Sequence, residues 1–146
     1  MICKDALGPS LGRAAHLVRA SMDARMSRYE ITPTQNHVLM YLRLHDKRAS
    51  QCEVTAYLRV KPSTANGILD RMVDKGLVER SISGSDARRR IITITEKGLA
   101  LQEQSHREFQ KVEAVIRRGL TAEEEKTFCA LLERITQNLE EDQTIC

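Results

Sequence analysis

With 146 residues, 41% of them apolar, the chain is long enough to bury an adequate core in one domain, and it has no apolar run that could span a membrane. Four cysteines without C-x-x-C spacing and the lack of a secretory signal argue against a disulfide framework and predict a cytoplasmic protein with no membrane partner. The net charge of +3 is uneven: residues 1–95 carry 16 Lys or Arg and 9 Asp or Glu, and the remainder carries 7 and 11. A basic first part is expected of a nucleic-acid binder, whereas the acidic remainder is better suited to self-association.

Two amphipathic helices are predicted in the first part of the chain. The first runs from about residue 6 to 28, with apolar positions at Leu7, Leu11, Ala14, Ala15, Val18, Met22 and Met26. The second begins at Thr32, which forms a capping box with Gln35, and Pro33 suits its first position. Its residues for burial are Val38, Leu39, Leu42 and Leu44.

A short helix, a tight turn and a longer helix follow without interruption. Ser50 and Glu53 form a second capping box, so a helix is expected from Ser50 to about Leu58. After a turn over residues 59–61, Pro62 begins a helix that Gly76 ends. Its apolar face holds Ala65, Ile68, Leu69, Met72 and Val73. The opposite face carries Pro62, Ser63, Asn66, Gly67, Asp70 and Arg71.

A hairpin with a basic tip comes next. Two runs rich in Val, Ile and Thr, residues 77–82 and 90–95, are separated by turn residues 83–86. Arg88, Arg89 and Arg90 stand beside this turn, and a flexible arginine loop next to a helix suits the narrow, negative minor groove of DNA. Residues 61–90 hold seven Lys or Arg against four Asp or Glu, a net of +3 that equals that of the whole chain. This order of elements predicts a winged helix-turn-helix; the alternatives are a solvated hairpin tip and a protein-interaction module without specific DNA binding.

Two long helices complete the chain. One is expected from Glu96 to about Gly119, with apolar residues Leu99, Leu101, Phe109, Val112, Val115 and Ile116. The last begins at Thr121, with Glu124 as its capping partner, and carries Phe128, Leu131, Leu132, Ile135 and Leu139. Apolar faces at both ends of the chain exceed what one domain covers, so we expect two chains to pair. The alternative is a monomer in which the first and last helices pack on the same domain.

Five runs of sequence carry a family resemblance: Val60–Thr64, Ile68–Arg80, Asp86–Arg88, Ile94–Gly98 and Ile31–Gln35. They resemble the multiple-antibiotic-resistance regulator (MarR) family over essentially the whole chain. The resemblance implies one domain of residues 1–146, mainly α with a small β-hairpin wing. Within it, residues 31–98 would form the DNA-binding lobe, and residues 1–30 and 99–146 the dimerisation helices.

A function follows from the same resemblance. It implies a homodimeric bacterial transcription regulator, usually a repressor, that a small molecule or oxidation releases from DNA. Two recognition helices related by a two-fold axis would enter successive major grooves of double-stranded DNA about 34–36 Å apart. The operator is therefore expected to be an inverted repeat.

The resemblance also implies roles for residues of the wing and the recognition helix. Arg88 would enter the minor groove, and Asp86 would orient it. Ala87 and Gly67 depart from the residues usual in the family, with Arg89 and Arg90 compensating for the first. A glycine inside a helix lowers helix stability by about 1 kcal/mol relative to alanine. At position 67 a glycine would allow the backbone to approach DNA more closely.

Side-chain chemistry supports further contacts on the same helix. Asn66 suits a two-bond contact with N6 and N7 of adenine. Ser63, Thr64 and the free amides of the first helical turn suit a phosphate oxygen, and Arg71 lies where phosphate is nearer than a base. The full set expected at DNA is Lys61, Ser63, Thr64, Asn66, Gly67, Arg71, Asp86, Arg88, Arg89 and Arg90.

An effector is expected in the cleft between the dimerisation helices and the DNA-binding lobe, where it would select one spacing of the lobes. The candidate lining residues are Arg13, Tyr29, His37 and Tyr41. Redox sensing is an alternative, and Cys52 is its candidate because it takes the second position of a helix whose dipole favours a thiolate. Cys3 and Cys146 are further candidates, whereas Cys129 beside Phe128 suggests core packing.

Metal binding and catalysis find little support in the sequence. The histidines lack ligand spacing, although His37 and His106 could meet at a dimer cleft. The sequence shows no nucleophile with a base and an orienting group, no Gly-rich phosphate loop and no carboxylate pair with a reason to be buried. We therefore expect no metal, no cofactor and no enzymatic activity.

Overall fold

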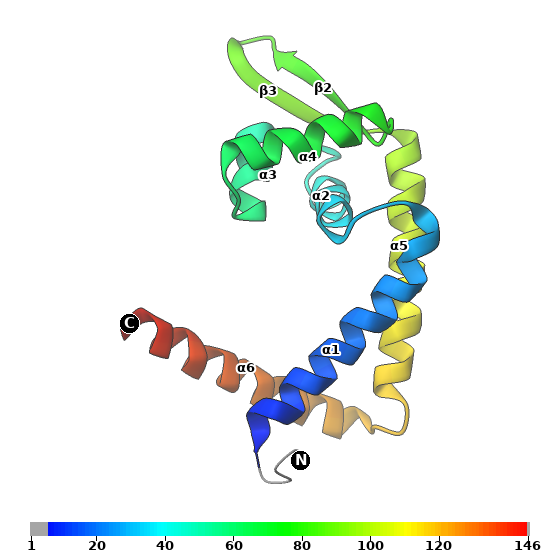
Figure 1. The fold of residues 1–146 in the computed structure, drawn as a ribbon, viewed down its shortest axis with the longest axis vertical. Helices are drawn as coiled ribbons and strands as arrows, with labels where there is room; N and C mark the ends of the chain where they lie inside the picture. Colours follow the sequence, from blue (N-terminus) through cyan, green and yellow to red (C-terminus); the bar gives the residue numbers. More distant parts are fainter. Residues whose placement is uncertain (1–5, 146) are drawn as a thin grey trace. The chain divides into compact units, whose positions relative to one another are not determined.

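The computed structural model describes residues 6–145, which are mainly helical with one small sheet (Figure 1). Its elements are α1 (Leu7–Met26), the single-turn helix η1 (Ser27–Tyr29), α2 (Pro33–Leu44), β1 (Arg48–Ser50), α3 (Gln51–Leu58), α4 (Pro62–Asp74), β2 (Val78–Ser83), β3 (Asp86–Ile94), α5 (Glu96–Arg117) and α6 (Ala122–Ile145). They form two compact units, one ending at Gln110 and the other beginning at Lys111. The fold is that of a mainly α protein with a β-hairpin wing, as predicted. Within the described range, no helix has the length and apolar character needed to cross a bilayer.

The predicted capping boxes begin α2 and α3. At α2, the Gln35 amide donates to the Thr32 hydroxyl at 3.1 Å and the Gln35 side chain accepts from the Thr32 amide at 3.3 Å. At α3, the corresponding Ser50 and Glu53 distances are 3.2 and 2.7 Å. Each box satisfies two backbone donors that a helix start leaves unpaired. Arg59 then adopts a left-handed conformation, with φ of 54°, and ends α3 just before Pro62 begins α4.

The sheet is larger than the predicted hairpin. It is antiparallel with the order β1-β3-β2, and the short strand β1, which sequence patterning did not indicate, pairs Ala49 with Ile92. Strand β3 begins at Asp86, not at Arg90, so the three wing arginines lie in a strand and the expected flexible arginine loop is wrong. Backbone pairing continues, past an irregularity after Ile82, to Ser83 and Asp86, although residues 84–90 are all exposed. An exposed strand shows no alternation of apolar and polar residues. The sequence pattern therefore did not predict the first residues of β3 as part of a strand.

The core lies between α2, α3, α4 and the sheet. Its completely buried side chains include Leu39, Leu42, Val54, Leu69, Met72 and Ile92. Two residues expected in this core are exposed: Leu44 to 73% and Val73 to 37%. Leu44 is rotated about 200° from Leu42 around α2, and Val73 is about 100° from Met72 around α4, so the buried stripes are narrower than predicted.

The unit from Lys111 onward has a capped helix and an open apolar face. The predicted capping box is present at the start of α6. The Glu124 carboxylate accepts from the Thr121 amide at 2.8 Å, and the Glu124 amide donates to the Thr121 hydroxyl at 3.2 Å. Phe128 is 50% exposed and Cys129 is exposed as well, so the expected core packing of Cys129 is wrong. This unit contains only α6 and the last turns of α5, and two helical segments enclose little volume.

Candidate nucleic-acid interface

The outer face of α4 is polar and exposed. Ala65, Leu69 and Met72 hold the helix against the core, which turns the side chains between them outward. Lys61 precedes the helix, and its first turn has Pro62 at the start and no side-chain cap, so backbone amides there are available to an anion. The exposed residues of the predicted set in this region are Lys61, Ser63, Thr64, Asn66 and Arg71, with Gly67 half-buried among them.

A polar network surrounds Asn66 on this face. The Gln51 side-chain amide donates to Asn66 Oδ1 at 3.3 Å, and Asn66 Nδ2 donates to Asp70 Oδ2 at 3.3 Å. Arg80, from β2, donates through Nη1 to Asp70 Oδ1 at 2.6 Å and through Nη2 to Asn66 Oδ1 at 3.4 Å. Sequence reasoning missed Gln51 and Arg80. The spacing of Asn66 and Asp70 indicates their contact, whereas Arg80 reaches them only because β2 folds back against α4.

The wing lies beside α4, where β2 and β3 form a projecting hairpin (Figure 1). Arg88, Arg89 and Arg90 are all exposed on β3. Asp86 accepts a hydrogen bond from the backbone amide of Arg88 at 2.9 Å, a contact with the main chain of that residue that leaves its guanidinium available. These residues place positive charge next to the polar face of α4, as a nucleic-acid surface requires.

A hollow separates the wing from the start of α3. Its lining includes Cys52, Glu53, Arg88, Arg89 and Arg90, and the Cys52 side chain is exposed. Hydrogen bonds from Ser50, first from its side chain and then from its backbone, lower the pKa of the Glu53 carboxyl, with a smaller contribution from the charge of Arg89. The hollow therefore combines an anionic carboxylate, three cations and one thiol.

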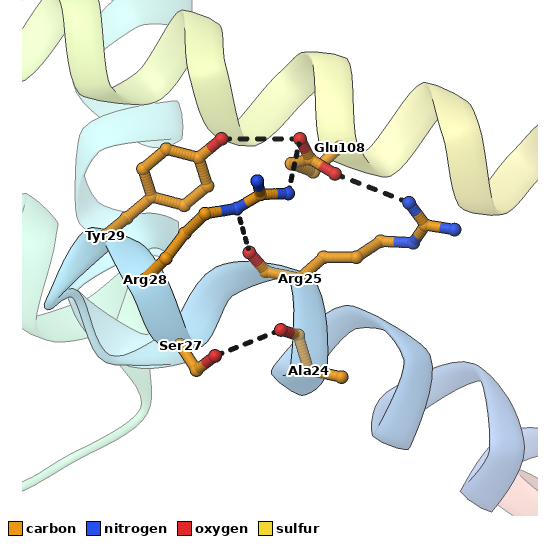
Figure 2. Close-up of polar contacts among 6 residues, drawn as sticks. All are labelled: Ala24, Arg25, Ser27, Arg28, Tyr29 and Glu108. Carbon is orange, nitrogen blue, oxygen red and sulfur yellow. Dashed lines mark hydrogen bonds and ion pairs between the residues drawn. The ribbon is translucent and has the colours of Figure 1, made fainter.

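Of the predicted effector residues, Tyr29 belongs to a cluster that surrounds one buried carboxylate near the end of α1. Figure 2 shows Arg25, Arg28 and Tyr29 pointing toward the carboxylate of Glu108 on α5. Tyr29 donates to Glu108 at 3.3 Å, Arg28 pairs with it at 3.3 Å and Arg25 at 3.5 Å, while only 3% of the Glu108 side chain is exposed. Charge neutralisation of this kind is what a buried carboxylate requires. The cluster joins α1 and η1 to α5.

The other predicted effector residues lie elsewhere. Tyr41 stacks on His45 with ring centroids 4.0 Å apart and contacts Tyr57 at 4.5 Å. His37 lines a hollow with Tyr57 and Arg59, whereas Arg13 is exposed on α1 and is separated from Met26 by 13 helical residues, about 20 Å. The four predicted residues thus have different surroundings within residues 6–145, and their common role in binding an effector stays a prediction.

The thiol and metal candidates are dispersed as well. Cys3 and Cys146 lie outside the described residues. His106 stacks near Phe109 and pairs with Gln110, on a different helix from His37. Over residues 6–145, no three His, Cys, Asp or Glu side chains gather as a metal site would require.

Comparisons with known proteins match this arrangement. A family model described as the MarR family matches residues 29–89, which include the helix-turn-helix and most of the wing. Wild-type E. coli MarR in its apo form is 31% identical, with 86% of this chain and 95% of that chain covered and a TM-score of 0.70. A mutant of E. coli MarR complexed with operator DNA is 30% identical, with 86% and 93% covered and a TM-score of 0.70. A mutant of S. aureus MepR, 24% identical over 92% and 98%, shares the fold with a TM-score of 0.80.

The match is thus one of sequence as well as fold. The two E. coli structures reach 30% identity or more over nearly their whole length, and the family model covers the elements that form the polar, basic face. Proteins of this family are regulators of transcription and not enzymes, which agrees with the expectation from the sequence. The chain belongs to the MarR family of transcription regulators.

Proposed function

We propose that this chain is a homodimeric repressor that binds an inverted-repeat operator in double-stranded DNA and is released by a small ligand. The observation that carries the proposal is the exposed polar face of α4 beside three arginines of β3. A relative of 30% identity was solved on operator DNA, and it matches this chain over 86% of the length. The same face of the fold is therefore the expected contact surface here.

Each part of this surface has a distinct role in the proposed complex. Arg88 enters the minor groove, while Arg89 and Arg90 contact the flanking phosphates together with Lys61. Ser63, Thr64 and the amides of the first turn of α4 position a phosphate, and Arg71 contacts another. Asn66 contacts a base edge. The buried residues of α4 fix these groups in one orientation before DNA arrives.

Exposed apolar side chains support the dimer. On α1, Leu7 is exposed to 72%, and Leu17 is also mainly exposed. In the unit from Lys111 onward, Ile116, Leu120, Phe128 and Leu131 line an apolar hollow. Each square ångström of apolar surface removed from water contributes about 25 cal/mol, so a second chain that covers these side chains gains a substantial driving force. A two-fold dimer presents one α4 to each half of an inverted repeat.

Ligand release is the remaining part of the proposal. The hollow formed by His37, Tyr57 and Arg59 offers an imidazole, an aromatic ring and a cation to a small molecule, close to the turn that precedes α4. A ligand that binds better to one spacing of the two recognition helices shifts the population toward that spacing. Release follows when the favoured spacing differs from the one that DNA requires.

Selection from randomised duplex DNA at two salt concentrations tests the proposal. We expect an enriched inverted repeat whose affinity falls steeply as salt rises, because phosphate contacts release counterions. A protein-interaction module would give no enriched sequence and weak, salt-insensitive binding. Either of those results would remove the operator-binding function.

Thiol-based redox sensing is a second candidate, and the position of Cys52 favours it. The exposed Cys52 lines the same hollow as Arg88, Arg89 and Arg90, so a modification there would alter the wing. Peroxide would transfer one oxygen to the Cys52 sulfur, forming a sulfenic acid and releasing water. Operator affinity is measured before and after peroxide in the wild type and in Cys52→Ser. Equal affinity in all four samples would end this idea.

A further inference from the structure

The side-chain amide of Asn66 is almost fully engaged before any DNA is present. Its oxygen accepts from Gln51 at 3.3 Å and from Arg80 at 3.4 Å, and its nitrogen donates to Asp70 at 3.3 Å. An amide oxygen offers two acceptor positions and an amide nitrogen two hydrogens. Both acceptor positions and one hydrogen are therefore used within the protein.

Asp70 and Arg80 determine which way round this amide lies. A carboxylate only accepts hydrogen bonds and a guanidinium only donates them, so neither partner can exchange its role. The two are themselves joined at 2.6 Å, with the Arg80 side chain 18% exposed and Asp70 50% exposed. Rotating the Asn66 amide by half a turn would set its oxygen against the carboxylate and its nitrogen against the guanidinium. Both contacts would then be repulsive, and the observed orientation is strongly preferred.

What remains for DNA is one hydrogen of Nδ2. Asn66 is exposed, and this hydrogen has no partner among residues 6–145. A two-bond contact with adenine requires the amide oxygen to accept from N6 while the nitrogen donates to N7. In this structure the oxygen is already occupied, and only the second of those two bonds can form.

We propose that Arg80 is a positioning residue that presents Asn66 to the major groove as a hydrogen-bond donor alone. The inference rests on the proposed operator binding and refines it. Asn66 then recognises an acceptor on a base edge, such as N7 or O6 of guanine, N7 of adenine or O4 of thymine, and gains nothing from the amino group of adenine. This replaces the two-bond adenine contact that the residue type alone predicts.

Base analogues in the selected operator separate the two modes of contact. Purine in place of adenine removes the N6 amino group, deazapurines remove N7, and pyrimidine analogues that lack O4 remove the thymine acceptor. Each substituted duplex is titrated with the wild type and with Asn66→Ala. We expect removal of one acceptor to weaken wild-type binding about 10-fold and to leave Asn66→Ala unaffected. Removal of N6 should weaken both proteins equally at every position.

Three variants of the arginines extend this test to Arg80. Arg80→Met frees one lone pair of the Asn66 oxygen, so a dependence on adenine N6 should appear that the wild type lacks. Arg80→Lys keeps a cationic donor and should retain wild-type selectivity. Arg48→Met removes the same charge from β1 of the same sheet and should change affinity without changing base preference. Circular dichroism and thermal unfolding verify that each variant is folded.

Two outcomes would overturn the inference. One is an N6-dependent loss of about 10-fold in the wild type that Asn66→Ala abolishes, because it would show the two-bond contact. The other is the absence of any analogue effect that depends on Asn66. Failure of the proposed function would look different, since no operator would be enriched in the selection at all. The wild-type titrations decide the question even if Arg80→Met does not fold.

Discussion

The winged lobe and the terminal helices differ in how they use similar apolar patterns. In the lobe, Leu39, Leu69 and Ile92 are completely buried by other elements of the same chain. On the outer helices, Leu7 is 72% exposed and Leu139 is 59% exposed, although each belongs to an apolar stripe predicted from the sequence. An apolar stripe predicts that a helix face is buried, but it does not indicate whether the same chain or a second chain buries that face. The lobe buries its core within one chain, whereas the outer helices leave apolar side chains exposed. We propose that a second copy of this chain covers them.

The largest effect is expected at Leu42, within the winged lobe. Leu42→Ala removes a completely buried side chain from α2 and should lower the free energy of unfolding by about 2–5 kcal/mol. Leu44→Ala, on the same helix but 73% exposed, should change it by less than about 0.5 kcal/mol. Urea denaturation measures both. Similar losses of unfolding free energy in the two variants would mean that Leu44 is buried in solution. The contrast between a buried and an exposed leucine on α2 would then be wrong.

The second effect concerns association. Phe128 is half exposed on α6, so Phe128→Ala should leave the fold intact and weaken the proposed dimer by about 2 kcal/mol, which is roughly 30-fold in Kd. Sedimentation equilibrium measures the dissociation constant. Lys126→Ala, exposed on the same helix, serves as the control and should associate as the wild type does. A wild-type chain that remains monomeric at micromolar concentration would contradict the dimer itself.

The third effect lies at the wing. Arg88→Ala should weaken operator binding by about 1–3 kcal/mol without altering the unfolding transition, because the side chain is exposed in the free protein. Arg107→Ala removes the same charge from an exposed position on α5 and should retain most of the affinity. Fluorescence anisotropy at several salt concentrations measures both variants. Wild-type affinity in Arg88→Ala would refute its assignment to the minor groove.

The fourth effect separates stability from binding on α4. The nearest atom to a methyl group at position 67 would be Arg71 Nη2 at 4.0 Å, so Gly67→Ala should stabilise the helix by about 0.5–1 kcal/mol. The same methyl group stands between the backbone and DNA and should weaken operator binding. Gly98→Ala provides the contrast, since its methyl group would lie 2.2 Å from the Leu77 oxygen and must destabilise the lobe. If Gly67→Ala binds DNA as tightly as the wild type, the close-approach role is wrong.

The smallest effect is a pH dependence at the start of α3. Because Ser50 lowers the folded-state pKa of Glu53, this carboxylate adds stability above its unfolded pKa, and that stability is lost as the pH falls through the folded value. Glu53→Gln keeps a capping acceptor without the charge and should lack this acid-dependent loss. An NMR titration of the Glu53 carboxyl in the wild type and in Ser50→Ala checks the cause. An ordinary pKa in the wild type would remove the prediction.

Local chemistry explains why much of the lobe was predictable. Thr32 with Gln35, and Ser50 with Glu53, are complete capping boxes within four residues, and Pro62 marks the start of α4 without any tertiary contact. The existence of β1 was not predictable, because it depends on distant pairing such as that of Ala49 with Ile92. The start of β3 was not predictable either, because its first residues are exposed and show no alternation of apolar and polar side chains. The same holds for Arg80, which comes from β2 and meets Asn66 only in the folded chain.

By itself, the sequence determined the order of the helices, their starts, the basic wing and the candidate DNA-binding residues of α4. These features depend on residue type and on spacings of three or four positions, which act over a few ångströms. Tertiary structure alone decided which apolar stripes are covered, that the wing arginines lie in a strand, and which hydrogen of Asn66 remains free. Those features depend on how strands pair and elements pack in the folded chain, which spacings of three or four positions do not encode.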